Sequence, residues 1–441
     1  MLKPYLAKIE LTPECSNACI YCFNVERNAP RKELTPYQKW MLLTSLETKK
    51  ENLRKILERF HSIGFKEVTY TGGEPTLQKE LLLFGIREAR KNNLKPSLNT
   101  NLKHVTQEDI SAFADAGLES ILASYASSDP VTFTSIMGAT AQEYAALTAL
   151  LPHIVASPLK LEVNMVAVQQ NKNQVYTTGE FLHKECGVNN FGASPITPTS
   201  HEQNAFALQP KEILEVMDQL LLLHERHGMS VFSVRPYTLC LIKDPQKYFF
   251  ITSRCTPPES DTVVTLDGDV RFCTMINDGS FGSIFTDSFD DILTKLFTYK
   301  GSLPLDKACT VCVEYPSCGG GCPVDRMHAE GSIYQKRIPF KHPLDKRPHV
   351  EALSARDIFI RQDLDVEELP DGKYKIRAQG LPGTAVQLDV PEFTLLQIIY
   401  KEKNQEQRNV QDIIIKHNLR EHFVNVFLTK LYKKGYVEVH E

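Results

Sequence analysis

Residues 8–24 read KIELTPECSNACIYCFN, and this stretch places three cysteines directly after a short strand-like run. Cys15, Cys19 and Cys22 follow the run KIEL in a loop, with the spacing C-x3-C-x2-C. Structural zinc normally takes four protein ligands, so three thiols without an obvious local fourth make a poor zinc site. A [4Fe-4S] cluster held by three thiolates leaves one iron open for a substrate or cofactor to chelate. The stretch therefore favours a cluster over a zinc knuckle completed from a distance.

Outward from this stretch, short β-rich runs alternate with segments of helical apolar spacing as far as residue 234. The helical segments lie at 40–60, 80–90 and 208–228. Strand-like runs lie at 8–11, 67–70, 96–99, 120–124, 161–168, 190–195 and 230–234. Repeated strand-helix units predict a parallel sheet, either a barrel or a doubly wound sheet.

Composition restricts the class of protein. Of the 441 residues, 42% are hydrophobic and 24% charged, and no apolar run approaches the roughly 18 to 20 residues of a membrane span. The first residues lack the order of a secretory signal, so we expect a soluble, cytoplasmic protein. Nine of the 11 cysteines lie in two groups, which in a reducing compartment indicates metal ligands. The net charge of -4 gives no overall basic field for nucleic acid.

The cysteine loop resembles that of the radical S-adenosylmethionine (SAM) superfamily, in which an aromatic residue, here Tyr21, precedes the third cysteine. TGGEP at residues 71–75 resembles the motif that grips the methionyl amine of SAM in that superfamily. The resemblance implies that SAM contacts Gly72, Gly73, Glu74 and Pro75. The glycines would let the backbone carbonyls approach SAM closely, and Glu74 could pair with its ammonium group. It also implies cleavage of SAM to methionine and a 5'-deoxyadenosyl radical that abstracts hydrogen.

Polar residues follow several predicted strands, where parallel barrels place their active sites. Asn99, Asn101, Ser124 and Asn164 are expected on this face. In relatives, polar residues at the ends of the fourth and fifth strands contact the cofactor's ribose and carboxylate, which makes Ser124 and Asn164 the candidates. The alternative is that such residues only cap the next helix.

A second cysteine group resembles the SPASM extension of peptide-modifying radical enzymes. Cys255 and Cys273 flank Gly268 in the pattern C-x12-G-x4-C, and a quartet follows as C-x2-C-x5-C-x3-C. The resemblance implies one or two auxiliary [4Fe-4S] clusters, the first held by Cys255, Cys273 and Cys322 and the second by Cys309, Cys312 and Cys318. Zinc in the quartet is the alternative.

Each auxiliary set then lacks a fourth ligand. The family pattern has a further cysteine after the quartet, but none follows Cys322 in this sequence. The second cluster could use Asp325, His328, His342 or another oxygen or nitrogen ligand, or keep an open iron. Cys240 could complete the first cluster or could be a core residue. Cys186, inside a helical run, is expected to be structural.

We predict three domains: a partial (β/α)6 TIM-like barrel at 1–234, the SPASM domain at 235–347 and a winged-helix-like α+β module at 350–441, with a linker at 336–350. The module has 13 Lys and Arg against 15 Asp and Glu, a net charge of 13 - 15 = -2, which argues against DNA. It is similar to elements that bind the leader of a precursor peptide as an added strand, here between residues 358 and 390. A stabilising or dimerising role is the alternative.

About 350 residues match this architecture, which implies an oxygen-sensitive radical SAM/SPASM enzyme that crosslinks a ribosomally made peptide. The expected partners are a leader-bearing precursor and an electron donor such as flavodoxin or ferredoxin, with no nucleic acid and no membrane. The sequence does not specify the bond formed, which could be a thioether, a C-C bond as in a cyclophane, or a C-O bond. It also does not specify the catalytic acid or base or the oligomeric state. The alternatives are an enzyme of the anaerobic sulfatase-maturating type that oxidises a Cys or Ser of a protein, and an iron-sulfur redox sensor that binds DNA.

Overall fold

The chain forms two compact units, residues 1–310 with 317–338, and residues 311–316 with 339–441. The predicted linker at 336–350, Cys312, His328 and His342 lie outside the described residues. The computed structural model describes residues 5–24, 34–242, 247–248, 250–251, 254–276, 279–305, 309, 315–327, 357–360, 364–369, 373–378, 386–388, 390–404, 409–417, 424, 427–428, 431 and 436–440.

The first unit is built on one sheet of nine strands, in the order β7-β6-β5-β4-β3-β2-β1-β8-β9. The strands are β1 (Leu6–Thr12), β2 (Glu67–Gly72), β3 (Lys95–Thr100), β4 (Ser120–Ser124), β5 (Lys160–Ala167), β6 (Asn190–Pro195), β7 (Ser230–Phe232), β8 (Asp261–Thr265) and β9 (Val270–Arg271). All seven predicted strands are present, and neighbours from β1 to β7 pair in parallel. Because the strand order follows the chain without reversing, the sheet winds as a barrel wall does, unlike a doubly wound sheet.

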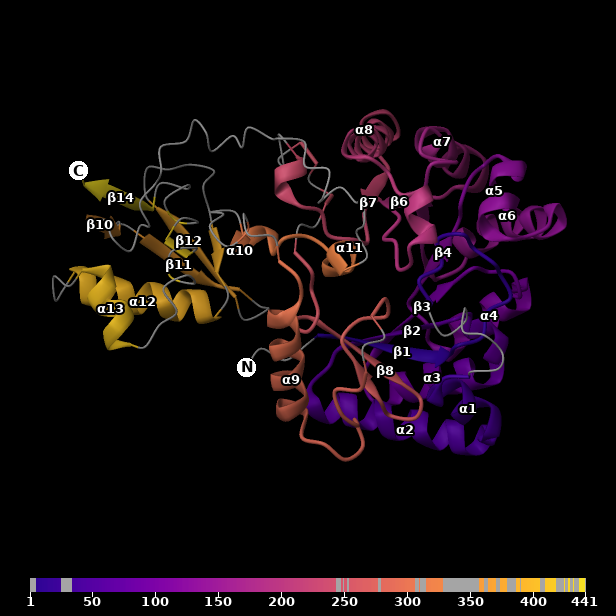
Figure 1. Ribbon diagram of the computed structural model, residues 1–441, viewed down its shortest axis with the longest axis horizontal. Coiled ribbons are helices and arrows are strands. Elements are labelled where there is room, and N and C mark those ends of the chain that lie inside the picture. The colour runs from indigo at the N-terminus through magenta and orange to yellow at the C-terminus, as the bar shows by residue number, and fades with distance from the viewer. Residues whose placement is uncertain are drawn as a thin grey trace. The chain divides into compact units, whose positions relative to one another are not determined.

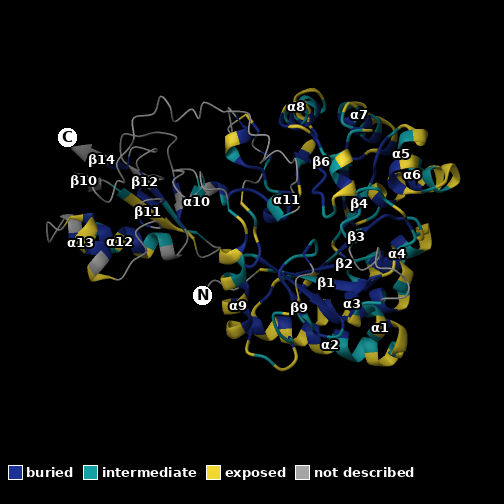
Figure 2. Cartoon of the chain, viewed as in Figure 1, coloured by how far each residue is buried: buried dark blue, intermediate teal, exposed yellow. Residues whose placement is uncertain are grey.

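Helices connect the strands and follow the outer side of the sheet (Figure 1). The short helices are η1 (Pro75–Gln78), η2 (Glu202–Phe206), η3 (Leu239–Leu241), α10 (Tyr315–Cys318) and α11 (Pro323–Met327), and α9 (Phe289–Ser302) follows β9. The connecting helices are α1 (Pro36–Leu43), α2 (Leu46–Ile63), α3 (Lys79–Lys91), α4 (Gln107–Ala116), α5 (Pro130–Met137), α6 (Ala141–Ala156), α7 (Val175–Cys186) and α8 (Pro210–His227). Their inner faces are buried and their outer faces exposed (Figure 2), as expected of amphipathic helices on a sheet.

The single helix predicted at 40–60 is wrong, because two helices occupy this region. α1 ends at Leu43 and α2 begins at Leu46. Ser45 caps α2, since its side chain accepts a 3.2 Å hydrogen bond from the Thr48 backbone N–H. Such a cap offers the backbone a start signal that apolar spacing alone does not reveal.

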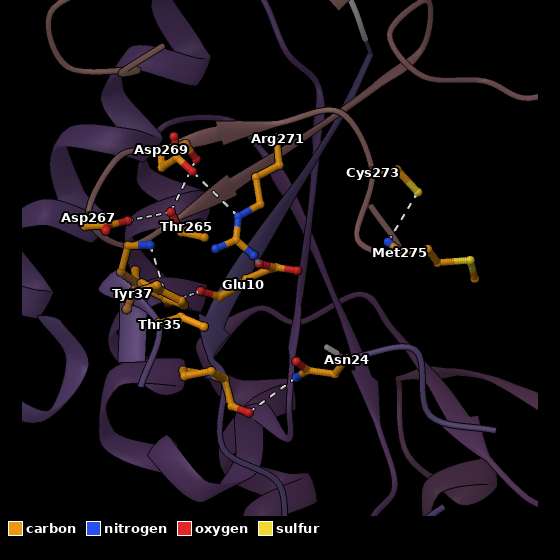
Figure 3. Close-up of polar contacts among 12 residues, drawn as sticks. Glu10, Asn24, Thr35, Tyr37, Thr265, Asp267, Asp269, Arg271, Cys273 and Met275 are labelled. Carbon is orange, nitrogen blue, oxygen red and sulfur yellow. Dashed lines mark hydrogen bonds and ion pairs between the residues drawn. The ribbon is translucent and has the colours of Figure 1, made fainter. Parts of the chain in front are cut away.

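The cysteine-rich segment continues the sheet of the barrel. β8 pairs in parallel with β1, and β9 pairs antiparallel with β8. Arg271 of β9 forms a 2.8 Å ion pair with Glu10 of β1, and the Tyr37 hydroxyl donates to the Glu10 carbonyl (Figure 3). The segment after residue 234 is therefore anchored to the first strand, next to the cysteine loop.

The second unit contains two small antiparallel sheets and its own core. β10 (Asp357–Ile360) pairs with β14 (Val437–His440), and β11 (Leu364–Glu368), β12 (Tyr374–Ala378) and β13 (Val386–Leu388) form the other sheet. Helices α12 (Val390–Asn404) and α13 (Val410–Lys416) pack with them around buried residues such as Ile376, Leu388 and Ile399. The winged-helix arrangement of this unit stays a prediction. No helix in the described parts of either unit has the length and apolar character needed to cross a membrane.

Candidate functional site

The cysteine loop after β1 is fixed by backbone contacts from distant elements. The Asn24 side chain donates to the Pro13 carbonyl at 3.3 Å and closes the loop on itself (Figure 3). At the end of α5, the Met137 carbonyl accepts the Ala18 N–H at 3.2 Å. The Gln203 amide donates to the Cys22 carbonyl at 2.9 Å. The loop therefore has a defined shape set by the barrel around it.

Tyr21 lies beside the three cysteines of this loop. Its hydroxyl donates to the Met137 sulfur at 2.8 Å. Burial, followed by the neighbouring thiols of Cys19, Cys22 and Cys15, raises the pKa of Tyr21 well above its usual value. The phenol therefore stays neutral and acts as a hydrogen-bond donor next to the thiols.

The TGGEP loop after β2 packs directly against the start of the cysteine loop. The Gly73 N–H donates to the Thr12 carbonyl at 2.6 Å, and the Glu74 N–H donates to the Glu14 carbonyl at 2.7 Å. A Cβ on Gly73 would lie 1.9 Å from the Glu14 oxygen, and one on Gly72 would lie 2.3 Å from the Thr12 oxygen. These glycines permit the close contact between the two loops. The sequence had predicted only that they let the backbone approach a ligand.

Glu74 connects the segments of this region through buried hydrogen bonds. Its side chain is buried and accepts hydrogen bonds from the Thr76 N–H at 3.1 Å, the Thr76 hydroxyl at 2.7 Å, the Thr100 hydroxyl at 2.7 Å and the Asn101 N–H at 2.8 Å. Asn101 in turn donates to the Cys15 sulfur at 3.8 Å. Glu74 thus braces the loops, mainly through its Oε1 atom, whereas its Oε2 atom accepts only the Asn101 N–H.

Replacing Glu74 with Gln is expected to lower the free energy of unfolding by about 1–3 kcal/mol, because an amide NH2 would face N–H and O–H donors in a buried site. Burial raises the pKa of Glu74 from 4.5, against the opposing hydrogen bonds. The folded state then binds a proton more readily than the unfolded state, so the contribution of Glu74 to stability falls as pH rises from 4.5 through the raised pKa. The Gln variant loses this dependence.

Urea unfolding of the iron-free protein at several pH values measures both effects of this substitution. Glu80→Gln is the matched control, since the Glu80 side chain is 69% exposed in α3 and its pair with Lys50 lies at the surface. Equal unfolding midpoints for the two variants would contradict a bracing role for Glu74.

The predicted residues meet around one cavity of about 460 Å³. Ser124 of β4 and Asn164 of β5 are paired in register, and both line it. Pro75 does not line it, because its ring begins the short helix η1 behind the loop. The predicted site residues along the cavity are Cys15, Cys19, Tyr21, Cys22, Gly72, Gly73, Glu74, Asn99, Asn101, Ser124 and Asn164.

Three cysteines of the second group also approach one another. A β-bridge between Arg254 and Gly321 places the following residues, Cys255 and Cys322, side by side. Cys273 interacts electrostatically with both. Its sulfur accepts the Met275 N–H at 3.4 Å (Figure 3), and Met275 lines the cavity. The cavity therefore extends from the first cysteine group to the vicinity of the second.

Burial controls the ionisation of these thiols. It raises the pKa of Cys255 to about 12, against the opposing charge of Lys300. Burial likewise raises the pKa of Cys273 and of Cys322. Lys300 donates to the Cys255 carbonyl at 2.9 Å, which fixes this cation beside the thiol. A ligand that needs thiolates would have to displace protons here.

The remaining cysteines have distinct environments. Cys186 is buried, as predicted for a structural residue, whereas Cys240 is exposed, so its interpretation as a core residue is wrong. Cys318 is buried, and its sulfur accepts the Leu239 N–H at 3.4 Å. The Asp325 carboxylate is buried in an ion pair with Arg235 through its Oδ2 atom.

The donor chemistry of the first loop fits an iron-sulfur cluster better than a single ion. In the part of the chain that the structure describes, no three Cys, His, Asp or Glu side chains converge on a single-ion site. The three thiols instead stand along a cavity wall with Tyr21 among them. Cluster thiolates bind different irons and do not converge on one atom, which suits this arrangement.

Comparison with known proteins identifies the part of the first unit that carries the two motifs. Residues 9–182 match the radical SAM superfamily. These residues form a radical SAM domain. The match covers β1, the cysteine loop and the TGGEP loop, so the superfamily predicted from those motifs is confirmed.

The curated relatives of this chain include enzymes whose names give different substrates. GTP 3',8-cyclase of Mannheimia succiniciproducens is 30% identical over 134 residues, which cover 30% of this chain and 36% of the cyclase. PqqA peptide cyclase of Bradyrhizobium diazoefficiens is 34% identical over 116 residues, 26% of this chain and 27% of the relative. PqqA peptide cyclase of Rhodopseudomonas palustris is 29% identical over 169 residues, 38% of this chain and 41% of the relative. The chain thus aligns with less than half of each relative.

Solved structures share the fold over a longer stretch. The crystal structure of Streptococcus suis SuiB bound to precursor peptide SuiA has a TM-score of 0.59 at 14% identity, covering 75% of this chain and 74% of SuiB. Native anSMEcpe with bound AdoMet and Kp18Cys peptide has a TM-score of 0.56 at 17% identity, covering 75% of this chain and 92% of anSMEcpe. At these identities the likeness concerns the fold.

Several residues at the site were not predicted from the sequence. Met137 and Gln203 form hydrogen bonds with the cysteine loop, and no sequence motif predicts these contacts. Lys8 and Arg235 line the cavity as cations. A signal existed for Lys8, because parallel strands read as nearly continuous apolar runs and a lysine inside the first strand breaks that pattern.

Proposed function

We propose that this chain is a radical SAM/SPASM peptide maturase that modifies a ribosomally made precursor peptide. The observation that carries the proposal is that one cavity is lined both by Cys15, Cys19 and Cys22 and by Thr274 and Met275, which follow Cys273 in the chain. A substrate held there would lie between the two cysteine groups.

The residues of the first loop would hold a [4Fe-4S] cluster through Cys15, Cys19 and Cys22. With SAM bound, that cluster supplies a 5'-deoxyadenosyl radical for hydrogen abstraction. Ser124 and Asn164 would orient the ribose and carboxylate of SAM, and the Glu74 network would keep Cys15 in position through Asn101.

Cys255, Cys273 and Cys322 would hold one auxiliary [4Fe-4S] cluster, and Cys309, Cys312 and Cys318 a second. Auxiliary clusters would accept the electron released when the substrate radical forms its new bond. An electron donor such as flavodoxin or ferredoxin would supply the reducing electron in the cytoplasm. The names of the PqqA peptide cyclases and the SuiB-SuiA complex support a peptide substrate over the sulfatase-maturating and DNA-binding alternatives.

In this proposal the module at 350–441 binds the leader of the precursor. β11 supports this role, because its side chains from Asp365 to Glu368 are exposed and it pairs with β12 along one edge. A leader that adds a strand gains main-chain hydrogen bonds with limited sequence demand. Docking the leader would raise the effective concentration of the core peptide at the cavity.

Incubating the anaerobically reconstituted enzyme with SAM, a reductant and a precursor encoded beside its gene is expected to yield 5'-deoxyadenosine and a peptide lighter by two hydrogen atoms. Removing the leader is expected to lower kcat/KM by more than about tenfold, mainly through KM, because the core peptide then binds without the leader's docking energy. A precursor with a scrambled leader is the control. Equal modification of leader-bearing and leaderless peptides would contradict leader recognition, and unmodified peptide with intact SAM would contradict the maturase itself.

A further inference from the structure

Lys8 is a cation on the inner wall of the cavity, in the strand that leads to the cysteine loop. It lines the cavity together with Cys15, Cys19 and Cys22. Its side chain keeps 29% of its surface accessible, whereas its ion-pair partner Asp261 keeps 4%. A charge placed inside a barrel wall is costly unless it serves a nearby charge. Lys8 is therefore expected to serve the charges that surround it.

The pair between Lys8 and Asp261 joins the barrel to the cysteine-rich segment. Lys8 lies on β1, and Asp261 begins β8, which pairs in parallel with β1. The other carboxylate oxygen of Asp261 is buried and has no hydrogen-bond partner among the residues that the structure describes. The Lys8 ammonium is thus the group that balances this buried acid.

The same strands bring this pair to the second cysteine group. In the β8–β9 ladder Val263 pairs with Arg271, and continuing that antiparallel register by two residues places Cys273 opposite Asp261. Lys8 interacts electrostatically with Cys273 and with Cys255. Burial alone would lower the pKa of Lys8, but Asp261 and the two thiols raise it overall, so the side chain stays protonated.

We infer that Lys8 and Asp261 form a fixed charge pair that sets the reduction potential of the cluster that Cys255, Cys273 and Cys322 would hold. This inference rests on the proposed function, because it requires that auxiliary cluster. When a substrate radical closes onto an X–H group, a C–X bond forms, the X–H bond breaks, the proton leaves to water and one electron goes to the oxidised auxiliary cluster. The ammonium would offset the negative charge that this electron adds.

The test is an EPR-monitored redox titration of the full-length, anaerobically reconstituted protein in a Cys15→Ala, Cys19→Ala, Cys22→Ala background, which isolates the auxiliary signals. Lys8→Met is expected to shift the potential of one auxiliary signal downward, and Asp261→Asn is expected to shift the same signal upward. The double variant is expected to return close to the background value, and Lys8→Arg to stay near it. Lys160→Met is the matched control, because the Lys160 side chain at the start of β5 is 60% exposed, pairs with Glu162 at 2.5 Å and should shift nothing.

The opposite signs separate an electrostatic role from a structural one, because a structural role would move both single variants in the same direction. Shifts of the same sign, or none, overturn the inference while the auxiliary cluster stands. If Lys8→Met does not load iron, Asp261→Asn is compared with the double variant instead. Asp261→Asn keeps the Lys8 ammonium and the double variant does not, so the inference requires the higher potential in Asp261→Asn. A background protein without any auxiliary signal would overturn the auxiliary part of the proposed function and this inference with it, whereas the peptide assay tests the maturase separately.

Discussion

Replacing Cys15, Cys19 and Cys22 together with Ala is expected to abolish SAM cleavage and to reduce the iron content of the reconstituted protein from about 12 to about 8 per chain. The three thiols lie on one loop along the cavity and are the ligands proposed for the cluster that binds SAM. Loss of that cluster removes the source of the radical and leaves the auxiliary sites intact.

Iron and acid-labile sulfide per chain, measured together with 5'-deoxyadenosine formation, test this expectation. Cys186→Ala is the matched control, since Cys186 is buried at the end of α7 and takes no part in either cysteine group. A wild-type value of about 8 irons would leave one auxiliary site unfilled and require the electron path to be redrawn. Zinc in place of iron, unchanged in the triple variant, would refute the proposed cluster.

Gly73→Ala is expected to reduce SAM cleavage by about 100-fold, because a misplacement of about 1 Å in a positioned catalytic group costs that much. The new Cβ would lie 1.9 Å from the Glu14 carbonyl oxygen, so the backbone just before Cys15 has to move. The movement would also break the hydrogen bonds that Gly73 and Glu74 donate to that segment. We expect the cysteine loop to lose its fixed relation to the TGGEP loop.

SAM affinity and 5'-deoxyadenosine formation measure the effect of Gly73→Ala, and iron content tells whether the cluster still assembles. Gly301→Ala in α9 provides the control, because a Cβ there would meet no atom within 4 Å. Unchanged cleavage by Gly73→Ala would mean that the contact between the two loops has no part in SAM binding or cleavage.

Much of the fold followed from local patterns in the sequence. The alternation of β-rich runs with helical segments predicted all seven strands from β1 to β7. It misjudged the region of α1 and α2, where the cap at Ser45 divides two helices that apolar spacing joins into one. Periodicity reports which face of a segment is buried, but a helix boundary depends on single side-chain hydrogen bonds.

The motifs of the candidate site could also be predicted from the sequence, but the contacts that their residues make could not. The spacing of Cys15, Cys19 and Cys22 and the TGGEP stretch predicted the superfamily. The sequence suggested that Glu74 would face an ammonium, which stays a prediction, and the structure adds that its carboxylate accepts hydrogen bonds from Thr76, Thr100 and Asn101. A motif names the residues that gather at a site, and only their packing shows which of them already have partners.

The sequence by itself determined the strand-helix alternation, the two cysteine groups and the chemistry that three thiols in one loop can support. The tertiary structure alone decided that Lys8 meets Asp261, 253 residues away, and that Arg235 meets Asp325, 90 residues away. It also decided that the cysteine-rich segment joins the sheet beside β1. Local composition sets what a segment can form, but which segments become neighbours depends on strand pairing across the whole chain, where the favourable contacts are non-local.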